Sequence, residues 1–404
     1  MKNSTKFNYI DIFAGCGGLS LGFFNAGWKG VFAVEKNIDA FSTLKFNLID
    51  NKNHFEWPSW LPQKEHDINE LTKNYQDELN LLKGKVDLVA GGPPCQGFSL
   101  AGRRNLGDTR NELVDSYIKF VELIEPKAVF FENVKGFTHT FNPGSKKEKK
   151  FSHYVIEELK RLGYNVYPDL INVAELGLPQ RRHRFILIGF KNKNIKPEIF
   201  FKRLKENKSK FLKLKNLDDS PSLEEAISDL NTEHGKEVSP DTKTFFSGKY
   251  GKPDSKFQAF LRNGYSSKHK LPDSHRIPNH SKFVVNKFSY ILKNCEKNKI
   301  ISEDLKIKFN TKKRTTIPLE GKTQSPTITS LPDDYIHYKE PRTLTVRECA
   351  RIQSFPDWFE FKGKYTTGGK ARKQEVPRYT QVGNAIPPLF AEQCAIVLRE
   401  ILDK

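Results

Sequence analysis

Five short apolar runs, rich in β-branched and aromatic residues, recur through the first 190 residues of the chain. Stretches with the apolar spacing of an amphipathic helix lie between several of them, at 38–49, 111–124 and 152–162. This alternation predicts an α/β fold with a mostly parallel, doubly wound sheet and helices on both faces. The strands are expected at 9–13, 31–34, 86–90, 128–131 and 184–190.

The pattern changes after residue 190. Residues 191–330 are rich in Lys, Asn and Ser and have weak periodicity, which predicts a linker and a smaller irregular domain. They hold 30 basic against 16 acidic side chains, so they carry +14 of the net charge of +19. A polyanionic partner explains this excess, and so does a Lys-rich solvated surface. Regular texture resumes near Arg342, and Pro388 to Leu402 is expected to be an amphipathic helix.

The cysteines and the apolar segments exclude several classes of protein. The five cysteines are scattered, without a CxxC pair or a Cys/His cluster, so neither a disulfide framework nor a zinc site is expected. The chain has no apolar leader and no unbroken apolar stretch of membrane length, which predicts a cytoplasmic protein. The cysteines are Cys16, Cys95, Cys295, Cys349 and Cys394.

A glycine-rich loop, residues 11–20, follows the first expected strand. Glycines there allow a tight turn and a close approach to a ligand beside the next helix N-terminus. Alone, this pattern serves NAD, FAD, S-adenosylmethionine or only a turn. Glu35 ends the second strand, where an acid can accept the ribose hydroxyls of an adenosyl cofactor. Asp67 could take the adenine amino group. Each acid could equally be a helix cap.

The most informative segment is Gly91–Ser99, which follows the third strand and contains Pro93-Pro94-Cys95. A Pro-Pro pair fixes the backbone, and a Cys in a Gly- and Pro-rich loop suits a nucleophile better than a packed core. The segment resembles the catalytic Pro-Cys loop of the DNA cytosine-5 methyltransferase family. Further family motifs follow in the family's order: 11–23, 132–134, 180–184, 342–356 and 381–388.

The resemblance implies a fold, a reaction and a domain plan. We expect a Rossmann-like, S-adenosylmethionine-dependent methyltransferase fold plus a small basic target-recognition domain. The catalytic and cofactor domain is expected at 1–190, the target-recognition domain at 191–340, and a C-terminal segment at 341–404 that returns to the catalytic domain. The implied reaction moves a methyl group from S-adenosylmethionine to carbon 5 of a cytosine flipped out of duplex DNA.

The resemblance also assigns roles to residues. Cys95 is expected to be the thiolate nucleophile that adds to ring carbon 6, and Glu132, in a protonated form kept by burial, to act at ring nitrogen 3. Arg182 and Arg184 are expected to share one face of a strand and to serve catalysis, with Arg184 holding the base. The cofactor, S-adenosylmethionine, is expected to contact Phe13, Gly15, Gly17, Gly18, Leu19, Glu35, Asp67, Ile68, Pro93, Leu113, Asn384 and Ala385. No metal is expected.

DNA contacts are expected from two regions. The segment from Phe98 to Thr109 resembles the family's mobile catalytic loop, with Ser99, Arg103 and Arg104 against DNA. In the basic region, Arg314 and Thr327 are candidates for base reading. We expect a monomer, encoded by a bacterium or phage, that acts on double-stranded DNA, with a cognate restriction endonuclease for the same site as a plausible partner.

Three other functions compete with this interpretation. A tRNA cytosine-5 methyltransferase on the same scaffold would have a shorter recognition region with Cys-Phe-Thr residues, which this chain lacks. A catalytically silent DNA-binding regulator would not need Cys95, Glu132 and Arg184 together. A nicotinamide oxidoreductase would leave the Pro-Pro-Cys and Glu-Asn-Val segments unexplained.

Overall fold

The computed structural model describes residues 7–94, 112–138, 151–263, 265, 271–311, 313–367 and 375–403. The chain divides into two compact units, each described here on its own. The first unit comprises Met1–Asn172, His183–Lys208 and Phe390–Lys404, and the second comprises Val173–Arg182 and Ser209–Leu389. Each unit is therefore built from separate stretches of the sequence.

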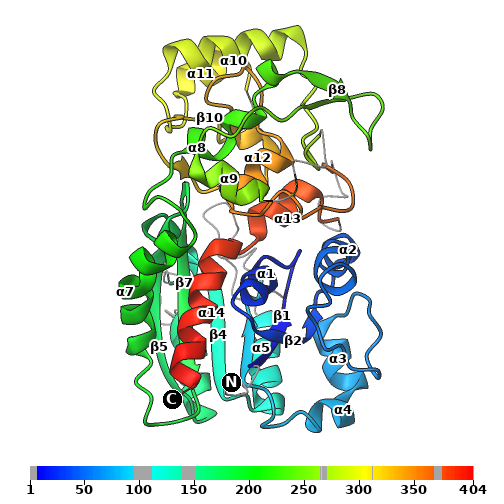
Figure 1. The fold of residues 1–404 in the computed structure, drawn as a ribbon, viewed down its shortest axis with the longest axis vertical. Helices are drawn as coiled ribbons and strands as arrows, with labels where there is room; N and C mark the ends of the chain where they lie inside the picture. Colours follow the sequence, from blue (N-terminus) through cyan, green and yellow to red (C-terminus); the bar gives the residue numbers. More distant parts are fainter. Residues whose placement is uncertain are drawn as a thin grey trace. The chain divides into compact units, whose positions relative to one another are not determined.

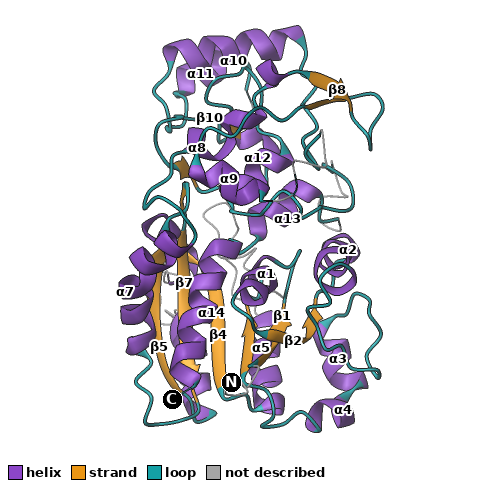
Figure 2. Ribbon diagram, viewed as in Figure 1, coloured by secondary structure: helices purple, strands orange, loops and turns teal. Residues whose placement is uncertain are grey.

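A six-stranded sheet forms the centre of the first unit, in the order β2-β1-β3-β4-β7-β5 (Figure 2). The pairs of β1 with β2, β1 with β3 and β3 with β4 are parallel, while β7 runs antiparallel to both β4 and β5. The predicted mostly parallel α/β sheet is confirmed, although the sequence prediction missed β5. The strands are β1 Asn8–Ile12, β2 Lys29–Val34, β3 Leu88–Gly91, β4 Ala128–Val134, β5 Asn165–Asn172 and β7 His183–Phe190.

Helices cover both faces of this sheet (Figure 1). One layer holds α1 (Gly18–Asn25), α14 (Pro388–Leu402) and the start of α7 (Glu198–Leu214). Within it, Trp28 Nε1 donates to Ala395 O at 3.0 Å, and the Asn207 amide donates to Glu400 at 3.1 Å. The opposite face packs against α3 (Ile68–Asn74), α4 (Gln76–Asn80), α5 (Glu112–Ile124) and α6 (Phe151–Arg161) through one large apolar cluster.

The helix α14 completes the first unit from the far end of the chain. It lies so close to α1 that a side-chain carbon on Gly22 would come within 2.4 Å of the Ala391 Cβ atom. The Arg399 guanidinium also donates to Ala26 O at 2.7 Å. The helix has the limits that the sequence predicts, Pro388–Leu402. Its residues from Phe390 onward belong to the first unit.

The second unit consists of short helices and two-stranded pairs. The antiparallel pair is β8 with β9, and the parallel pairs are β10 with β12 and β11 with β6. The helices are α8 Leu223–Ile227, α9 Lys256–Arg262, α10 Lys282–Asn294, α11 Glu303–Lys308, α12 Val346–Ile352 and α13 Arg378–Asn384. The strands are β6 Gln180–Arg181, β8 Lys236–Val238, β9 Phe246–Gly248, β10 Ile317–Pro318, β11 Ser325–Pro326 and β12 Tyr335–Ile336.

Helix α2 (Ile38–Leu44) of the first unit continues into a π-helical turn, Lys45–Asp50.

Buried ion pairs tie these short elements together. The fully buried Arg351 of α12 forms two bonds to the Asp357 carboxylate, at 2.9 and 2.7 Å, and also pairs with Asp229. Arg342 holds Glu348 with both terminal nitrogens, at 2.9 and 2.6 Å. A buried charge that is paired and hydrogen-bonded in this way fixes the geometry of the segments that carry it.

The limits of the two units differ from the predicted domain limits. Residues 341–389 lie in the second unit, because α12 and α13 pack with each other and α12 packs on α8. Residues 198–214, expected to be irregular, form the 17-residue helix α7. Within the described part of the chain, every helix is too short or too polar to cross a lipid bilayer.

Candidate active site

The glycine loop turns sharply between β1 and α1. Phe13, Gly15 and Gly17 all have positive φ, at 61°, 56° and 93°, a conformation that Gly adopts without cost and Phe does not. Among the described residues, no atom would lie within 4 Å of a side-chain carbon on Gly15. The loop thus has an open side at Gly15, as a ligand approaching the backbone requires.

Glu35 lies directly beside this open side. Its carboxylate accepts hydrogen bonds from Gly15 N at 2.9 Å and from Asn37 N at 2.7 Å. Burial raises the pKa of Glu35, while these N–H donors act to lower it. Because a carboxylate has about four acceptor positions, acceptor capacity remains for a hydroxyl donor. This donor-rich loop with a carboxylate at its side fits the ribose of an adenosyl cofactor.

Asp67 lies next to Glu35, since His66 N donates to Glu35 O at 2.8 Å. Its side chain is the N-cap of α3, accepting from Asn69 N at 2.8 Å. Its second oxygen pairs with Lys36 Nζ at 2.8 Å. The alternative that Asp67 is a helix cap is therefore confirmed as geometry, and any further contact must use the remaining acceptor capacity of the carboxylate.

A buried pair, Asp11 and Ser20, joins the two ends of the glycine loop, and the sequence analysis assigned it no role. The Ser20 hydroxyl donates to Asp11 Oδ2 at 2.5 Å, and Asp11 Oδ1 has no hydrogen-bond partner. Burial, opposed by the Ser20 hydrogen bond and aided by the charge of Glu35, raises the pKa of Asp11 to about 7. A polar pair on both sides of a glycine loop is the signal that could have revealed it.

Glu132 lies where β3 and β4 end side by side. A side-chain carbon on Gly92 would come within 2.6 Å of Glu132 Oε2, so Gly is needed there for the carboxylate to fit. The neighbouring Asn133 amide donates to Pro93 O at 3.2 Å. The Glu-Asn pair thus contacts the Gly-Gly-Pro-Pro segment immediately before Cys95.

Arg184 of β7 reaches the same carboxylate. Its Nε atom lies 2.6 Å from Glu132 Oε1, and both side chains are largely buried. Because Nε has no aligned hydrogen-bond acceptor, this contact is an ion pair rather than a straight N–H···O bond. A guanidinium beside a carboxylate favours its charged form. The expected protonated form of Glu132 stays a prediction.

Arg182 and Arg184, predicted to share one strand face, belong to different units. The strand is broken: β6 ends at Arg181 and pairs with β11, while β7 starts at His183 and joins the large sheet. Arg182 is almost fully buried in the second unit, where it donates to the carbonyl oxygens of Ile328 and Gly383, at 2.8 and 2.7 Å.

The remaining predicted cofactor residues fall in both units. Gly18 and Leu19 start α1, Ile68 starts α3 and is buried in the core, and Leu113 lies half-buried in the first turn of α5. Asn384 and Ala385 belong to the second unit, where Asn384 is the exposed last residue of α13.

The candidates for reading DNA bases occupy two different settings in the second unit. Arg314 is exposed, and its carbonyl accepts from Lys306 Nζ at 2.9 Å. The hydroxyl of the half-buried Thr327 donates to Arg181 O at 2.8 Å. Cys95, Ser99, Arg103 and Arg104 lie outside the described residues.

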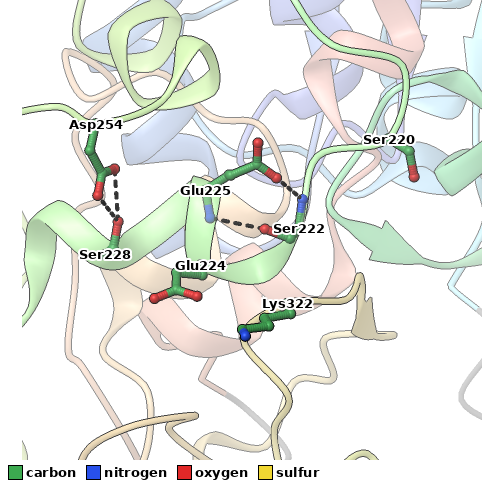
Figure 3. Close-up of a pocket in the computed structure, with 7 residues that line it drawn as sticks. All are labelled: Ser220, Ser222, Glu224, Glu225, Ser228, Asp254 and Lys322. Carbon is green, nitrogen blue, oxygen red and sulfur yellow. Dashed lines mark hydrogen bonds between the residues drawn. The ribbon is translucent and has the colours of Figure 1, made fainter.

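No metal-binding group of three or more His, Cys, Asp or Glu side chains occurs among the described residues, and the described cysteines are free thiols. A hollow at the start of α8 is lined by serines and acids (Figure 3). Its polar groups satisfy one another: Ser222 and Glu225 form a reciprocal capping box, and Ser228 donates to Asp254 at 3.0 Å. The hollow is therefore explained by helix capping.

The chain is similar to known proteins over almost its whole length. Residues 7–400 match the family described as C-5 cytosine-specific DNA methylase. The chain is 32% identical to the Type II methyltransferase M.DdeI of Desulfomicrobium norvegicum, over 96% of this chain and 87% of that protein. It is 31% identical to the Type II methyltransferase M1.HphI of Haemophilus parahaemolyticus, over 96% and 86% of the two chains.

The fold of this chain resembles the folds of solved methyltransferase structures. A putative DNA modification methyltransferase encoded within an E. coli prophage superposes with a TM-score of 0.67 and 23% identity, covering 99% of this chain and 100% of that one. The S. pombe Dnmt2 methyltransferase gives a TM-score of 0.54 and 14% identity, covering 98% and 99%. At these identities the likeness concerns the fold alone, which is that of a methyltransferase α/β sheet.

Proposed function

Because this chain belongs to the C-5 cytosine-specific DNA methylase family, we propose that Cys95, Glu132 and Arg184 methylate carbon 5 of a flipped-out cytosine. The chain is a DNA (cytosine-5)-methyltransferase of the Type II restriction-modification kind, and its methyl donor is S-adenosylmethionine. One observation carries the residue assignment: Glu132 and Arg184 meet beside the Gly92-Pro93 backbone that leads directly into Cys95.

Cys95 supplies the nucleophile in this proposal. Its thiolate adds to ring carbon 6, and the electron pair of the carbon 5–carbon 6 double bond makes carbon 5 an enamine-like nucleophile. When bound, S-adenosylmethionine supplies the electrophilic methyl group. A water molecule then accepts the carbon 5 proton, and the electron pair of that carbon–hydrogen bond re-forms the carbon 5–carbon 6 double bond and expels the Cys95 thiolate. The target base must leave the stack, because carbon 6 cannot be reached inside a duplex.

Glu132 and Arg184 change partners when the base enters. In the structure they neutralise each other at 2.6 Å. A base in this position offers its carbonyl oxygen to Arg184 and its ring nitrogen 3 to Glu132. Moving the guanidinium onto the carbonyl weakens the cation's hold on the carboxylate, which then takes up a proton for nitrogen 3 more readily. The proton on nitrogen 3 offsets the negative charge that thiolate addition places on the ring.

The glycine loop and its acids bind the cofactor in this proposal. The Glu35 carboxylate accepts the ribose hydroxyls, and Asp67 accepts the adenine amino group beside its contact with Lys36. Phe13, Pro93 and Leu113 supply apolar contacts, and Asn384 and Ala385 complete the site. No metal takes part. The fit rests on the open side of Gly15 and on the carboxylate beside it.

DNA recognition is assigned to the second unit and to the segment after Cys95. The net charge of +14 over 191–330 suits phosphate contacts. The exposed Arg314 can read a guanine edge, and Thr327 can accept through its hydroxyl, with Ser99, Arg103 and Arg104 on the backbone. We further propose a cytoplasmic monomer and a cognate endonuclease that cuts the same sequence.

The test is methyl transfer from labelled S-adenosylmethionine to unmethylated duplex DNA, followed by bisulfite sequencing. Wild type and Cys295→Ser, a thiol of the second unit outside the site, should both label cytosines in one short motif. Cys95→Ser should lose transfer completely. Labelling of tRNA in place of DNA would refute the substrate, and labelling by Cys95→Ser would refute the nucleophile.

Glu132→Gln and Arg184→Lys test the other two groups. Each should lower the single-turnover rate by about 10²- to 10⁴-fold, because each stabilises charge that develops on the base. Binding of S-adenosylmethionine should stay unchanged. A rate within about threefold of wild type for either variant would remove that residue from the catalytic group.

A further inference from the structure

Three segments of the second unit meet at Arg182, which the reaction scheme leaves unused. Its Nη1 atom donates to Ile328 O at 2.8 Å. Its Nη2 atom donates to Gly383 O at 2.7 Å and to Ala385 O at 3.3 Å. The side chain is about 1% exposed. A guanidinium in this position binds protein carbonyls through both of its terminal nitrogens.

Two buried glutamines complete the junction. The Gln353 amide donates to Val382 O at 2.8 Å and to Ala385 O at 3.3 Å. The Gln353 side-chain oxygen accepts from the Gln180 amide at 2.8 Å, and Gln180 Oε1 accepts from Ile328 N at 2.8 Å. Both glutamines are fully buried. The three side chains form one hydrogen-bonded group, here called the Arg182 clamp.

The clamp grips the C-terminus of α13. The carbonyls of Val382 and Gly383 belong to the last turn of that helix, where unpaired acceptors and the helix dipole favour a cation. The next residue, Asn384, is exposed. The clamp fixes the carbonyl groups of Val382, Gly383 and Ala385, which flank Asn384. These contacts therefore set the direction of the Asn384 side chain.

The same junction presses α13 against the segment 327–330. A side-chain carbon on Gly383 would come within 2.4 Å of Thr329 O and 2.6 Å of Ser330 N, so the two backbones touch. Tyr335 donates its hydroxyl to Thr327 O and holds this segment from the other side. The end of α13 and the segment 327–330 therefore cannot shift independently.

We propose that Arg182, with Gln180 and Gln353, is a positioning residue that fixes Asn384 for the cofactor against the segment carrying Thr327. The proposal rests on the cofactor role given to Asn384 above. It predicts a specific kinetic pattern. Loss of the clamp weakens binding of S-adenosylmethionine, while the chemical step at saturating cofactor continues, because Arg182 does not touch the base.

The experiment compares Arg182→Lys with Arg181→Lys, a matched change at the exposed neighbouring arginine. Lysine keeps the charge but cannot hold three carbonyls with one planar group. The dissociation constant of S-adenosylmethionine, measured by calorimetry without DNA, should rise about tenfold or more in Arg182→Lys and stay unchanged in Arg181→Lys. The single-turnover rate at saturating cofactor should stay within about threefold of wild type.

Two results would overturn the proposal. One is an unchanged cofactor affinity in Arg182→Lys, and the other is a rate at saturating cofactor that falls about 100-fold with unchanged affinity, which marks a catalytic residue. If Arg182→Lys does not fold, as judged by its thermal unfolding, Gln353→Leu carries the test. That variant keeps Arg182 and removes two donors to the same loop, so affinity should fall about fivefold.

The failure of the clamp can be told apart from the failure of the proposed cofactor site. If wild type and Arg181→Lys do not bind S-adenosylmethionine, the cofactor site itself is wrong. If both bind it and Arg182→Lys and Gln353→Leu bind it equally well, only the positioning role is wrong.

Discussion

Different interactions stabilise the interior of each of the two units of this protein. In the first, all four residues of β3 are buried, and apolar side chains from the sheet and from α5 and α6 form one cluster. In the second, the fully buried side chains include Arg347 and Arg351, which bind carboxylates and backbone carbonyls. The first unit depends on buried apolar volume, and the second depends on the geometry of a few charged groups.

Element length explains the contrast. Long strands and helices satisfy their own backbone groups, so the first unit can bury apolar faces. Most helices of the second unit have seven residues or fewer, among them α8, α12 and α13. Short helices leave a larger share of their backbone carbonyls unpaired. Long polar side chains then supply the partners, as the Arg351 bond to Ala226 O at 3.2 Å illustrates.

The largest effect is expected from breaking a charged tie in the second unit. Arg351→Met would leave Asp229 and Asp357 buried without their main partner, which should lower the free energy of unfolding by about 3–5 kcal/mol. Arg161→Met is the matched change at an exposed ion pair of the first unit, and its effect should be much smaller because solvent screens the pair. Urea denaturation followed by circular dichroism measures both. Equal losses would contradict the comparison.

Buried acids should give the two units opposite responses to pH. Burial raises the pKa of Asp11 from 3.8 to about 7, so the folded state keeps a proton that the unfolded chain loses. The stability from Asp11 is present below pH 4 and is lost as pH rises to about 7. Asp11→Asn should therefore remove about 2–4 kcal/mol of the decline in stability between pH 4 and pH 7. Urea denaturation at each pH measures it.

Glu348 in the second unit provides the opposite case. Burial alone would raise its pKa, but the charge and hydrogen bonds of Arg342 outweigh burial and hold the pKa well below its ordinary value. Its contribution to stability is present above about pH 4 and is lost as pH falls further. Glu348→Gln should flatten the acid side of the profile, whereas Asp11→Asn flattens the range from 4 to 7. Identical profiles for the two variants would refute this assignment.

The smallest effect is expected from a change of shape in the apolar core. Leu187 of β7 is fully buried in the first unit. Leu187→Met conserves the buried volume and should cost less than about 1.5 kcal/mol in urea denaturation. A loss as large as that of Arg351→Met would show that the first unit also depends on fixed geometry, and the distinction between the units would fail.

The sequence predicted the first unit better than the second. Strand and helix periodicity located β1, β2, β3, β4, β7 and α14. The strands were found because strands buried on both faces are nearly continuous apolar runs. It missed β5, at the edge of the sheet, where only Val166 and Ile171 are buried. It also missed α7, where lysines lie between the apolar residues. Residues 191–330, most of which lie in the second unit, gave only a weak periodic signal, and long-range ion pairs such as Arg351 with Asp229 leave none in the sequence.

The candidate active site was also predicted only in part. Motif spacing indicated Glu35, Asp67, Glu132 and Arg184, and the structure brings Glu35 next to Asp67 and Glu132 next to Arg184. The separation of Arg182 from Arg184 could not be predicted, since nothing in Gln-Arg-Arg-His-Arg marks the break between two sheets. The same holds for the Asp11–Ser20 pair, whose significance depends on burial.

The position of α14 has a consequence for how the protein is made. The helix fills the space beside Gly22 and Trp28, yet it is synthesised long after α1, which ends at Asn25. At bacterial rates of about 5–20 residues per second, the stretch between α1 and α14 takes on the order of 20–70 s to synthesise. We expect the first helix to wait through most of that time with an uncovered apolar face. A message truncated before residue 388 would leave that face exposed for good, as a surface for chaperones and proteases to recognise.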